Sequence, residues 1–338
     1  MDPLTHTLAG ANLAATRLGA TTRFAAAALV IGANLPDVDS ILYFTGHQDL
    51  AFGFRRGWTH GVLARLVLPC LQTALLLLAD RLRPSAARPA NARMLLLLSA
   101  LAICTHPFLD WLNTYGMRWL MPFRGTWFYG DSVYIMDPWL WLILGAGWLA
   151  GKRPNVWLIG AWLFFVVAIS WIVSRRSPQY LVVIAIVAIV LLAALVWRTE
   201  KHLATAALML ATLYIGGRLT IHAVTARAVQ REIPDARRLM VGPHPIDPRR
   251  WTVIAETANE YRFGDYVWGT GLTLHPETAP VPVDSPEYRQ ARAHPDLRGF
   301  MTWARFPAYR IERANGKTHV TLYDARRMGG SARTVTLD

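Results

Sequence analysis

Long apolar stretches alternate with short polar connections over roughly the first two thirds of the chain. A membrane-spanning helix needs about 20 mainly apolar residues, and five stretches meet that length: 62–79, 94–112, 156–173, 179–197 and 203–223. The stretch 138–151 is shorter and spans only with residues from its flanks, and 24–35 is predicted to be a re-entrant or buried helix. The pattern predicts a mainly α, polytopic membrane helical bundle.

After residue 223 the pattern changes to short β-branched and aromatic runs between turn residues. Two strands are predicted at 251–256 and 261–268, and a hairpin at 309–313 and 318–323, closed around Asn315-Gly316, which is a strong turn signal. The proline-rich residues 276–286 are predicted to form a loop. The chain therefore divides into a membrane-embedded helical domain, 1–222, and a small β-rich domain, 223–338.

Composition excludes an ordinary soluble enzyme, because 53% of the residues are hydrophobic and 17% charged, against about 25% charged in an average soluble domain. The formal charge is +13, and most of the excess lies in residues 1–222, where 18 Lys and Arg face 9 acids. Basic residues between membrane spans orient a protein in the bilayer. We therefore expect no nucleic-acid partner.

Basic residues divide unequally between two sets of connections. The connections 80–93, 151–155 and 198–202 carry eight Lys or Arg, whereas 113–137 and 174–178 carry four. By the positive-inside rule the first set is cytoplasmic, so the second set and everything after about residue 223 are predicted to be periplasmic. The Arg175–Arg176 pair argues against this orientation. The start lacks the basic region of a cleavable signal peptide, so we expect it to be retained.

Ionisable side chains within apolar stretches cost about 2.5 to 3.5 kcal/mol each at the centre of a bilayer, so they usually mark function. His106 and Asp110 are four residues apart, which places them on one helix face at a separation suited to two ligands of one metal. An intrahelical hydrogen bond is the alternative. Other potential ligands are predicted at the same membrane face: His6, Asp37, Asp39 and His60.

Imidazole and carboxylate ligands suit zinc or another first-row divalent ion, with manganese as a second choice. The two cysteines, Cys70 and Cys104, lie inside apolar runs, so a thiolate site is not expected. Six ligands are enough for one or two ions, and two ions about 3.5 to 4 Å apart can activate a water for ester hydrolysis. We therefore predict a metal-dependent hydrolase in which Asp39 and Asp110 are catalytic.

Four segments carry a family resemblance: Met-Asp-Pro-Leu-Thr-His-Thr-Leu-Ala-Gly (1–10), Leu-Pro-Asp-Val-Asp (35–39), Arg-Arg-Gly-Trp-Thr-His-Gly (55–61) and Thr-His-Pro-Phe-Leu-Asp-Trp-Leu-Asn-Thr-Tyr-Gly (105–116). They look like the YdjM-type family of bacterial inner-membrane proteins, held to be metal-dependent hydrolases. The similarity continues at 130–132, 136–138 and 300–307.

The resemblance implies a distant relation to zinc-dependent phospholipase C and the P1-type nucleases, and hence metal-site helices of that kind. It implies that the ligands are His6, Asp37 or Asp39, His60, His106 and Asp110. The soluble relatives have a further His/His/Glu group for a third zinc, which has no counterpart here. The resemblance therefore implies a mono- or dinuclear site.

Five further residues are candidates for supporting a metal ligand or for binding the substrate. Asp131 and Asp137 are placed to orient a ligand imidazole, and helix capping is the alternative, particularly for Asp137 before Pro138. Arg55, Arg56 and Arg124 are candidates for binding a substrate phosphate. The favoured alternative is that these arginines bind lipid headgroups without any catalysis.

The leading hypothesis is an inner-membrane hydrolase with its metal site at the outer face, acting on a lipid or lipid-linked ester or phosphoester in contact with membrane lipid. The rival is a non-enzymatic membrane protein, either a transporter with a His/Asp proton relay or a scaffold with a periplasmic binding domain. Clustering of ionisable groups at one face favours the hydrolase, whereas Arg65 and Arg218 inside spans favour the transporter. The sequence names no protein partner.

Overall fold

The computed structural model of the chain describes residues 1–85, 89–150, 202–282, 285–314, 316–327 and 332–337, with a few isolated positions between 157 and 171. The predicted spans 156–173 and 179–197, and the Arg175–Arg176 pair, lie outside the described residues. Contacts divide the chain into two units. The first comprises Met1–Val38, Arg56–Thr220 and His244–Pro248, and the second Asp39–Arg55, Ile221–Pro243 and Arg249–Asp338.

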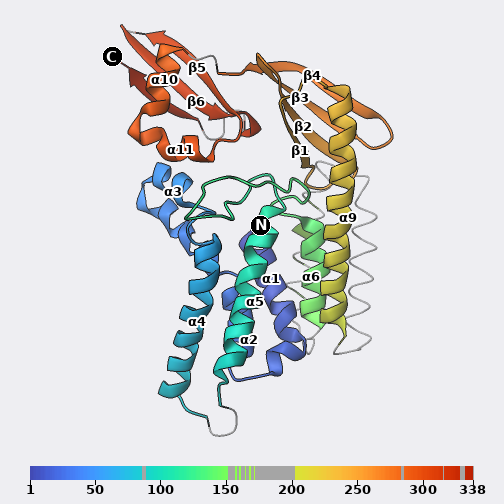
Figure 1. Ribbon diagram of the computed structural model, residues 1–338. Helices are drawn as coiled ribbons and strands as arrows, with labels where there is room; N and C mark the ends of the chain where they lie inside the picture. Colours follow the sequence, from blue (N-terminus) through green and yellow to red (C-terminus); the bar gives the residue numbers. More distant parts are fainter. Residues whose placement is uncertain are drawn as a thin grey trace. The chain divides into compact units, whose positions relative to one another are not determined.

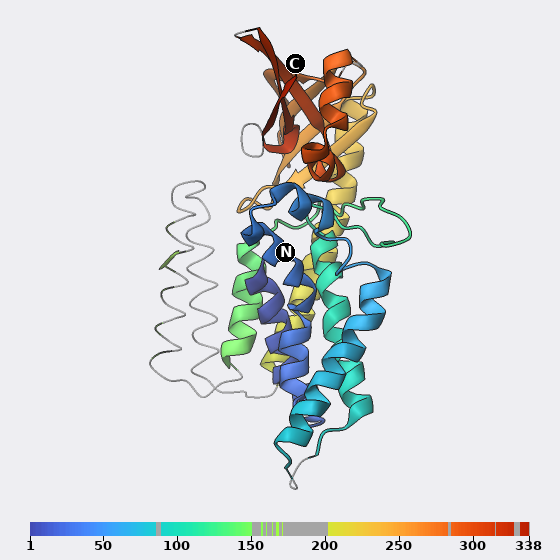
Figure 2. The same ribbon diagram turned by 90° about the vertical axis from the view of Figure 1, so that its left-hand side faces the viewer.

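The first unit is helical. Its helices lie side by side in both views (Figures 1 and 2) and are α1 (Pro3–Ala15), α2 (Ala25–Gly32), α4 (Val62–Leu82), α5 (Ala92–Trp111), α6 (Pro138–Ala150) and the first part of α9 (Leu203–Glu232). The 3-10 helix η1 (Arg17–Ala20) follows α1, and η2 (Leu35–Thr45) follows α2. Two clusters of buried apolar side chains form the core, one around Leu8, Leu112 and Leu140 and one around Leu29 and Leu98.

Among the residues that the structure describes, three helices are long and apolar enough to cross a membrane: α4, α5 and α9. The pair formed by α2 and η2 is bent by 45° and makes a fourth candidate if it is counted as one span. Helix α4 leaves Leu66, Leu71 and Leu75 exposed. Such a face suits lipid, because large apolar patches are rare on soluble monomers.

Glycine lets α1, α2 and α5 approach closely, as small residues do between membrane helices. A Cβ atom at Gly10 would lie 2.7 Å from the carbonyl oxygen of Leu29 and 2.9 Å from the Cβ of Ala33. A Cβ atom at Gly32 would lie 2.9 Å from the Cβ of Ala102. The close packing brings three helices together where His6 and His106 lie.

We expect Gly10→Ala to lower the midpoint of thermal unfolding of the full chain in detergent, because overpacking a close helix contact costs about 1 to 3 kcal/mol. The matched control is Gly216→Ala in α9, where no described atom lies within 4 Å of an added Cβ. There alanine removes only the flexibility of glycine, which stabilises by about 0.4 to 1 kcal/mol. A midpoint that rises in both variants would contradict the close α1–α2 contact.

The second unit contains two antiparallel sheets. One has the order β1 (Arg238–Pro243), β2 (Arg250–Glu256), β3 (Glu260–Val267), β4 (Gly271–Pro280), and the other β5 (Pro307–Ala314), β6 (Lys317–Asp324), β7 (Arg333–Leu337). Short helices accompany them: α3 (Gln48–Phe54), α10 (Pro286–Ala293) and α11 (Arg298–Trp303), with the 3-10 turns η4 (Pro295–Leu297) and η5 (Ala325–Arg327). Tyr261, Phe263 and Phe306 belong to one buried cluster shared by the sheets.

The four predicted strands appear as β2, β3, β5 and β6, and Gly316 of the predicted turn has a φ of 76°. The predicted loop 276–286 is wrong in its first part, because β4 continues to Pro280. Strand β4 is at the edge of its sheet, where a proline removes no required hydrogen bond. The second unit also differs from the predicted domain by including Asp39–Arg55.

Candidate metal centre

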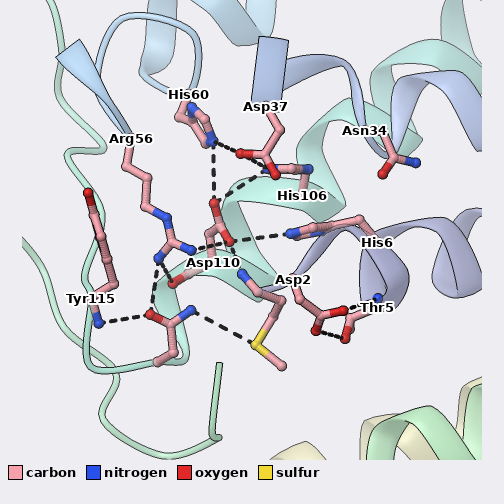
Figure 3. A network of polar contacts seen from close by, with 12 residues as sticks. Asp2, Thr5, His6, Asn34, Asp37, Arg56, His60, His106, Asp110 and Tyr115 are labelled. Atoms are coloured by element: carbon pink, nitrogen blue, oxygen red, sulfur yellow. Dashed lines mark hydrogen bonds and ion pairs between the residues drawn. The ribbon is translucent and has the colours of Figure 1, made fainter. Parts of the chain in front are cut away.

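Four residues of the first unit bring one ligand atom each to within 4.8 Å of one another: Asp37, His60, His106 and Asp110. We call them the four-donor group, and Figure 3 shows their side chains converging. They come from three places in the chain, since Asp37 lies in the first turn of η2, His60 lies just before α4, and His106 and Asp110 are one turn apart on α5. The imidazoles and Asp110 are fully buried, whereas the Asp37 side chain is 15% exposed.

The spacing of the donors fits a metal ion. Asp110 Oδ2 lies 3.3 Å from His60 Nε2 and 3.4 Å from His106 Nε2, and Asp37 Oδ1 lies 3.7 and 3.8 Å from the same two nitrogens. Tetrahedral zinc with bonds of about 2.0 to 2.1 Å separates its ligands by about 3.3 to 3.4 Å. His106 Nε2 and Asp110 Oδ2 are buried and make no hydrogen bond with any described residue, an arrangement that is costly without a ligand.

Hydrogen bonds orient the two imidazoles toward the carboxylates. His106 Nδ1 lies 2.7 Å from the carbonyl oxygen of Ala33; a carbonyl only accepts, so Nδ1 donates and Nε2 keeps its lone pair for a metal. His60 Nδ1 lies 2.8 Å from the Thr59 hydroxyl oxygen. Sequence reasoning missed both partners: Thr59 is recognisable as the neighbour of a ligand, but a backbone carbonyl has no sequence signal.

His6, on α1, lies beside the four-donor group. Its ring stacks on the His106 ring with centroids 3.6 Å apart, and its Nε2 lies 3.3 Å from Asp110 Oδ1. The same oxygen contacts the backbone nitrogen of Met1 and, at 2.9 Å, the Arg56 guanidinium. Asp110 therefore places Oδ2 beside the imidazoles of His60 and His106. Its Oδ1 lies beside His6, Arg56 and the Met1 nitrogen.

Arg56 is buried and holds the end of α5. Its guanidinium donates to the carbonyl oxygen of Asp110 at 3.2 Å and to Asn113 Oδ1 at 3.0 Å, and it lies 4.5 Å from the centre of the Tyr115 ring. Sequence reasoning missed Asn113 and Tyr115, although Asn113 follows Asp110 at a helical spacing of three. The structure gives Arg56 a role in orienting Asp110, and the substrate role stays a prediction.

The remaining predicted residues lie outside the four-donor group. Asp39 is buried in the second unit, where its Oδ1 lies 3.8 Å from Arg55 Nε. Arg124 is exposed, and Asp131 is buried in a loop where Gly130 and Ser132 donate backbone hydrogen bonds to Trp111 and Leu112 at the end of α5.

Asp137 caps α6 by accepting from the Leu140 amide at 3.0 Å, and it also accepts from the Tyr214 hydroxyl at 2.9 Å. Burial raises the pKa of Asp137 to about 6. These contacts match the capping alternative, and a role for Asp131 or Asp137 in orienting a ligand stays a prediction.

Comparison with known proteins shows that the chain matches a protein family. The model of the YdjM inner membrane protein family matches residues 1–179, more than half of the chain, and these residues include the whole four-donor group. The chain is 29% identical over 132 residues to the Bacillus subtilis (strain 168) protein named "Uncharacterized protein YfhP".

That match covers 38% of this chain and 38% of the relative, so the chain spans well under two thirds of the relative's length. No solved structure matches, and the comparisons do not show the similarity to phospholipase C or P1 nuclease. The family match and the three apolar helices agree that this is a membrane protein. The chain belongs to the YdjM inner membrane protein family.

Proposed function

We propose that the protein is a membrane-bound, metal-dependent hydrolase of an ester or phosphoester bond. The observation that carries the proposal is the four-donor group, in which two imidazole nitrogens and two carboxylate oxygens from three separate segments converge. An intrahelical hydrogen bond between His106 and Asp110 does not account for the convergence of His60 and Asp37. Nitrogen and oxygen donors at this spacing suit zinc first and manganese second.

Catalytic zinc sites have three protein ligands and one open position. The imidazoles of His60 and His106 are fully buried and share buried Asp110 Oδ2 as a neighbour, at 3.3 and 3.4 Å. Asp37 is partly exposed, and its Oδ1 lies farther from the two imidazole nitrogens. We therefore assign His60, His106 and Asp110 as ligands. Asp37, which is partly exposed, is assigned as the carboxylate that would accept a proton from the attacking water.

A bound divalent ion lowers the pKa of a coordinated water to about 7 and polarises the substrate oxygen. The protein's residues hold this arrangement, since Ala33 orients His106 and Arg56 orients Asp110. In the reaction, the water oxygen bonds to the carbonyl carbon or phosphorus, the bond to the leaving oxygen breaks, and the leaving oxygen gains a proton. A catalytic role for Asp39 stays a prediction.

The membrane setting supports a lipid or lipid-linked substrate, because the unit that carries the centre also carries the apolar helices α4 and α5. We propose a multi-pass arrangement in the bacterial inner membrane, with the centre and the second unit on the periplasmic side. The positive-inside count supports this orientation. Of the eight basic residues counted as cytoplasmic, Arg81, Arg83 and Arg93 are among the described residues.

The two arginines that favoured the transporter hypothesis, Arg65 and Arg218, have backbone partners in the structure. Arg65 donates to the carbonyl oxygens of Gly61 and Trp119 and stacks on the Trp119 ring. Arg218 donates to the carbonyl oxygens of Ser132 and Pro248. Both arginines therefore bind backbone groups within the first unit, which explains their presence in apolar segments without a proton path.

Elemental analysis of the purified full chain tests the proposal, with about one zinc or manganese ion per chain as the expected result. A panel of phosphoesters and lipid esters should show hydrolysis that a chelator abolishes and the returned metal restores. Protein purified with zinc present but free of stoichiometric metal would contradict the centre. Metal-loaded protein that hydrolyses no member of the panel would contradict the enzymatic role.

A further inference from the structure

The segment Asp39–Arg55 links two parts of the four-donor group along the chain. It begins two residues after Asp37 and ends five residues before His60, and both of these members of the four-donor group belong to the first unit. The segment itself folds as part of the second unit, together with residues near the end of the chain. Its conformation therefore depends on residues that are remote in sequence from the metal centre.

The main anchor of this segment is Asp49, in α3. Its Oδ2 accepts from the Gly299 amide at 2.8 Å, and its Oδ1 accepts from the Phe300 amide at 2.7 Å. The backbone at Gly299 is also in close contact, since an added Cβ there would lie 1.8 Å from the carbonyl oxygen of Asp49. A charged acceptor that binds two backbone N–H groups makes hydrogen bonds roughly twice as strong as neutral ones.

Aromatic side chains of α3 and α11 also pack against one another. The Phe52 ring lies 4.8 Å from the Trp303 ring and 6.2 Å from the Phe300 ring, and all three side chains are buried. Arg333 of β7 donates to Gln48 and lies 5.4 Å from the centre of the Phe52 ring. Figures 1 and 2 show α3 beside α11 within the second unit.

We propose that Asp49 is a positioning residue for the metal centre: by holding α3 on α11, it fixes both ends of the segment that joins Asp37 to His60. The inference rests on the metal centre of the proposed function. Arg56, which orients Asp110, directly follows the segment. A loosened segment gives Asp37, Arg56 and His60 more conformations, and metal binding must then order them at a cost in conformational entropy.

The test is a cobalt titration of the metal-free full chain in detergent, followed by visible absorption and by competition with zinc. We expect Asp49→Ala to keep one site per chain, to weaken cobalt affinity about 10- to 100-fold, the range for residues that support metal ligands, and to change the absorption band. Asp49→Asn should lie between wild type and Asp49→Ala, because its amide has one accepting oxygen. Gly299→Ala changes the α11 side of the contact between α3 and α11, and it should also weaken cobalt binding.

The matched control is Asp296→Ala, which removes an acid with an 83% exposed side chain close to α11 and should leave affinity and spectrum unchanged. Wild-type affinity and spectrum in both Asp49→Asn and Gly299→Ala would overturn the positioning role, even where Asp49→Ala does not fold. An equal loss in Asp296→Ala would also overturn it. A wild-type chain that binds no cobalt would overturn the proposed function itself, which is a separate outcome.

Discussion

Asp110→Asn is expected to reduce metal affinity by more than about 100-fold, because losses at supporting residues alone reach about 10- to 100-fold and Asp110 supplies the oxygen shared by both imidazoles. The change also leaves Arg56 buried without its carboxylate partner. Breaking a buried ion pair by removing one partner costs roughly 3 to 5 kcal/mol. Metal content after purification and the thermal unfolding midpoint of the metal-free chain measure the two effects.

The control for this variant is Asp80→Asn. Asp80 is also paired with an arginine, since its Oδ1 lies 2.6 Å from Arg23 Nη1, but it is near the far end of α4 from His60. About 18 residues of helix rise roughly 27 Å, so this change should not affect the metal. Equal metal content in the wild type and Asp110→Asn would refute the assignment of Asp110 as a ligand.

Asp324→Asn is expected to destabilise the second unit by roughly 3 to 5 kcal/mol, the cost of breaking a buried ion pair. Asp324 is fully buried, and its carboxylate accepts from the Arg305 amide at 2.6 Å and from the Arg326 guanidinium at 2.8 Å. An asparagine oxygen can keep one of these bonds but not the charge. Thermal or denaturant unfolding of the full chain in detergent, followed by near-ultraviolet circular dichroism of its aromatic residues, measures the loss.

The stability that Asp324→Asn removes should depend on pH. Burial alone would raise the pKa of Asp324, but Arg326 and the backbone amides outweigh burial and lower it. Because the folded pKa lies below the unfolded value of about 4, the stabilisation is present in full above about pH 4 and disappears as pH falls through the folded pKa. The wild type and Asp324→Asn should therefore converge in stability at low pH. A stability difference that stays constant from neutral to acid pH would contradict this charge interaction.

The apolar pattern determined much of the fold without tertiary information. Helices α4 and α5 begin and end within a few residues of the predicted stretches, because length and composition alone distinguish a membrane-spanning helix. The hairpin of β5 and β6 follows from alternating side chains and a glycine turn. His106 and Asp110 were recognisable as a pair because the helical period places residues four apart on one face.

Only the tertiary structure decided which residues lie beside His106 and Asp110. Asp37 and Asp39 have the same local signal, but residues two apart in a 3-10 helix point in directions about 120° apart, so packing selected Asp37. The Ala33 carbonyl reaches His106 because Gly10 and Gly32 let three helices approach closely. Periodicity within a segment depends on nearby residues and is readable from sequence, whereas convergence of distant segments depends on how complete surfaces pack.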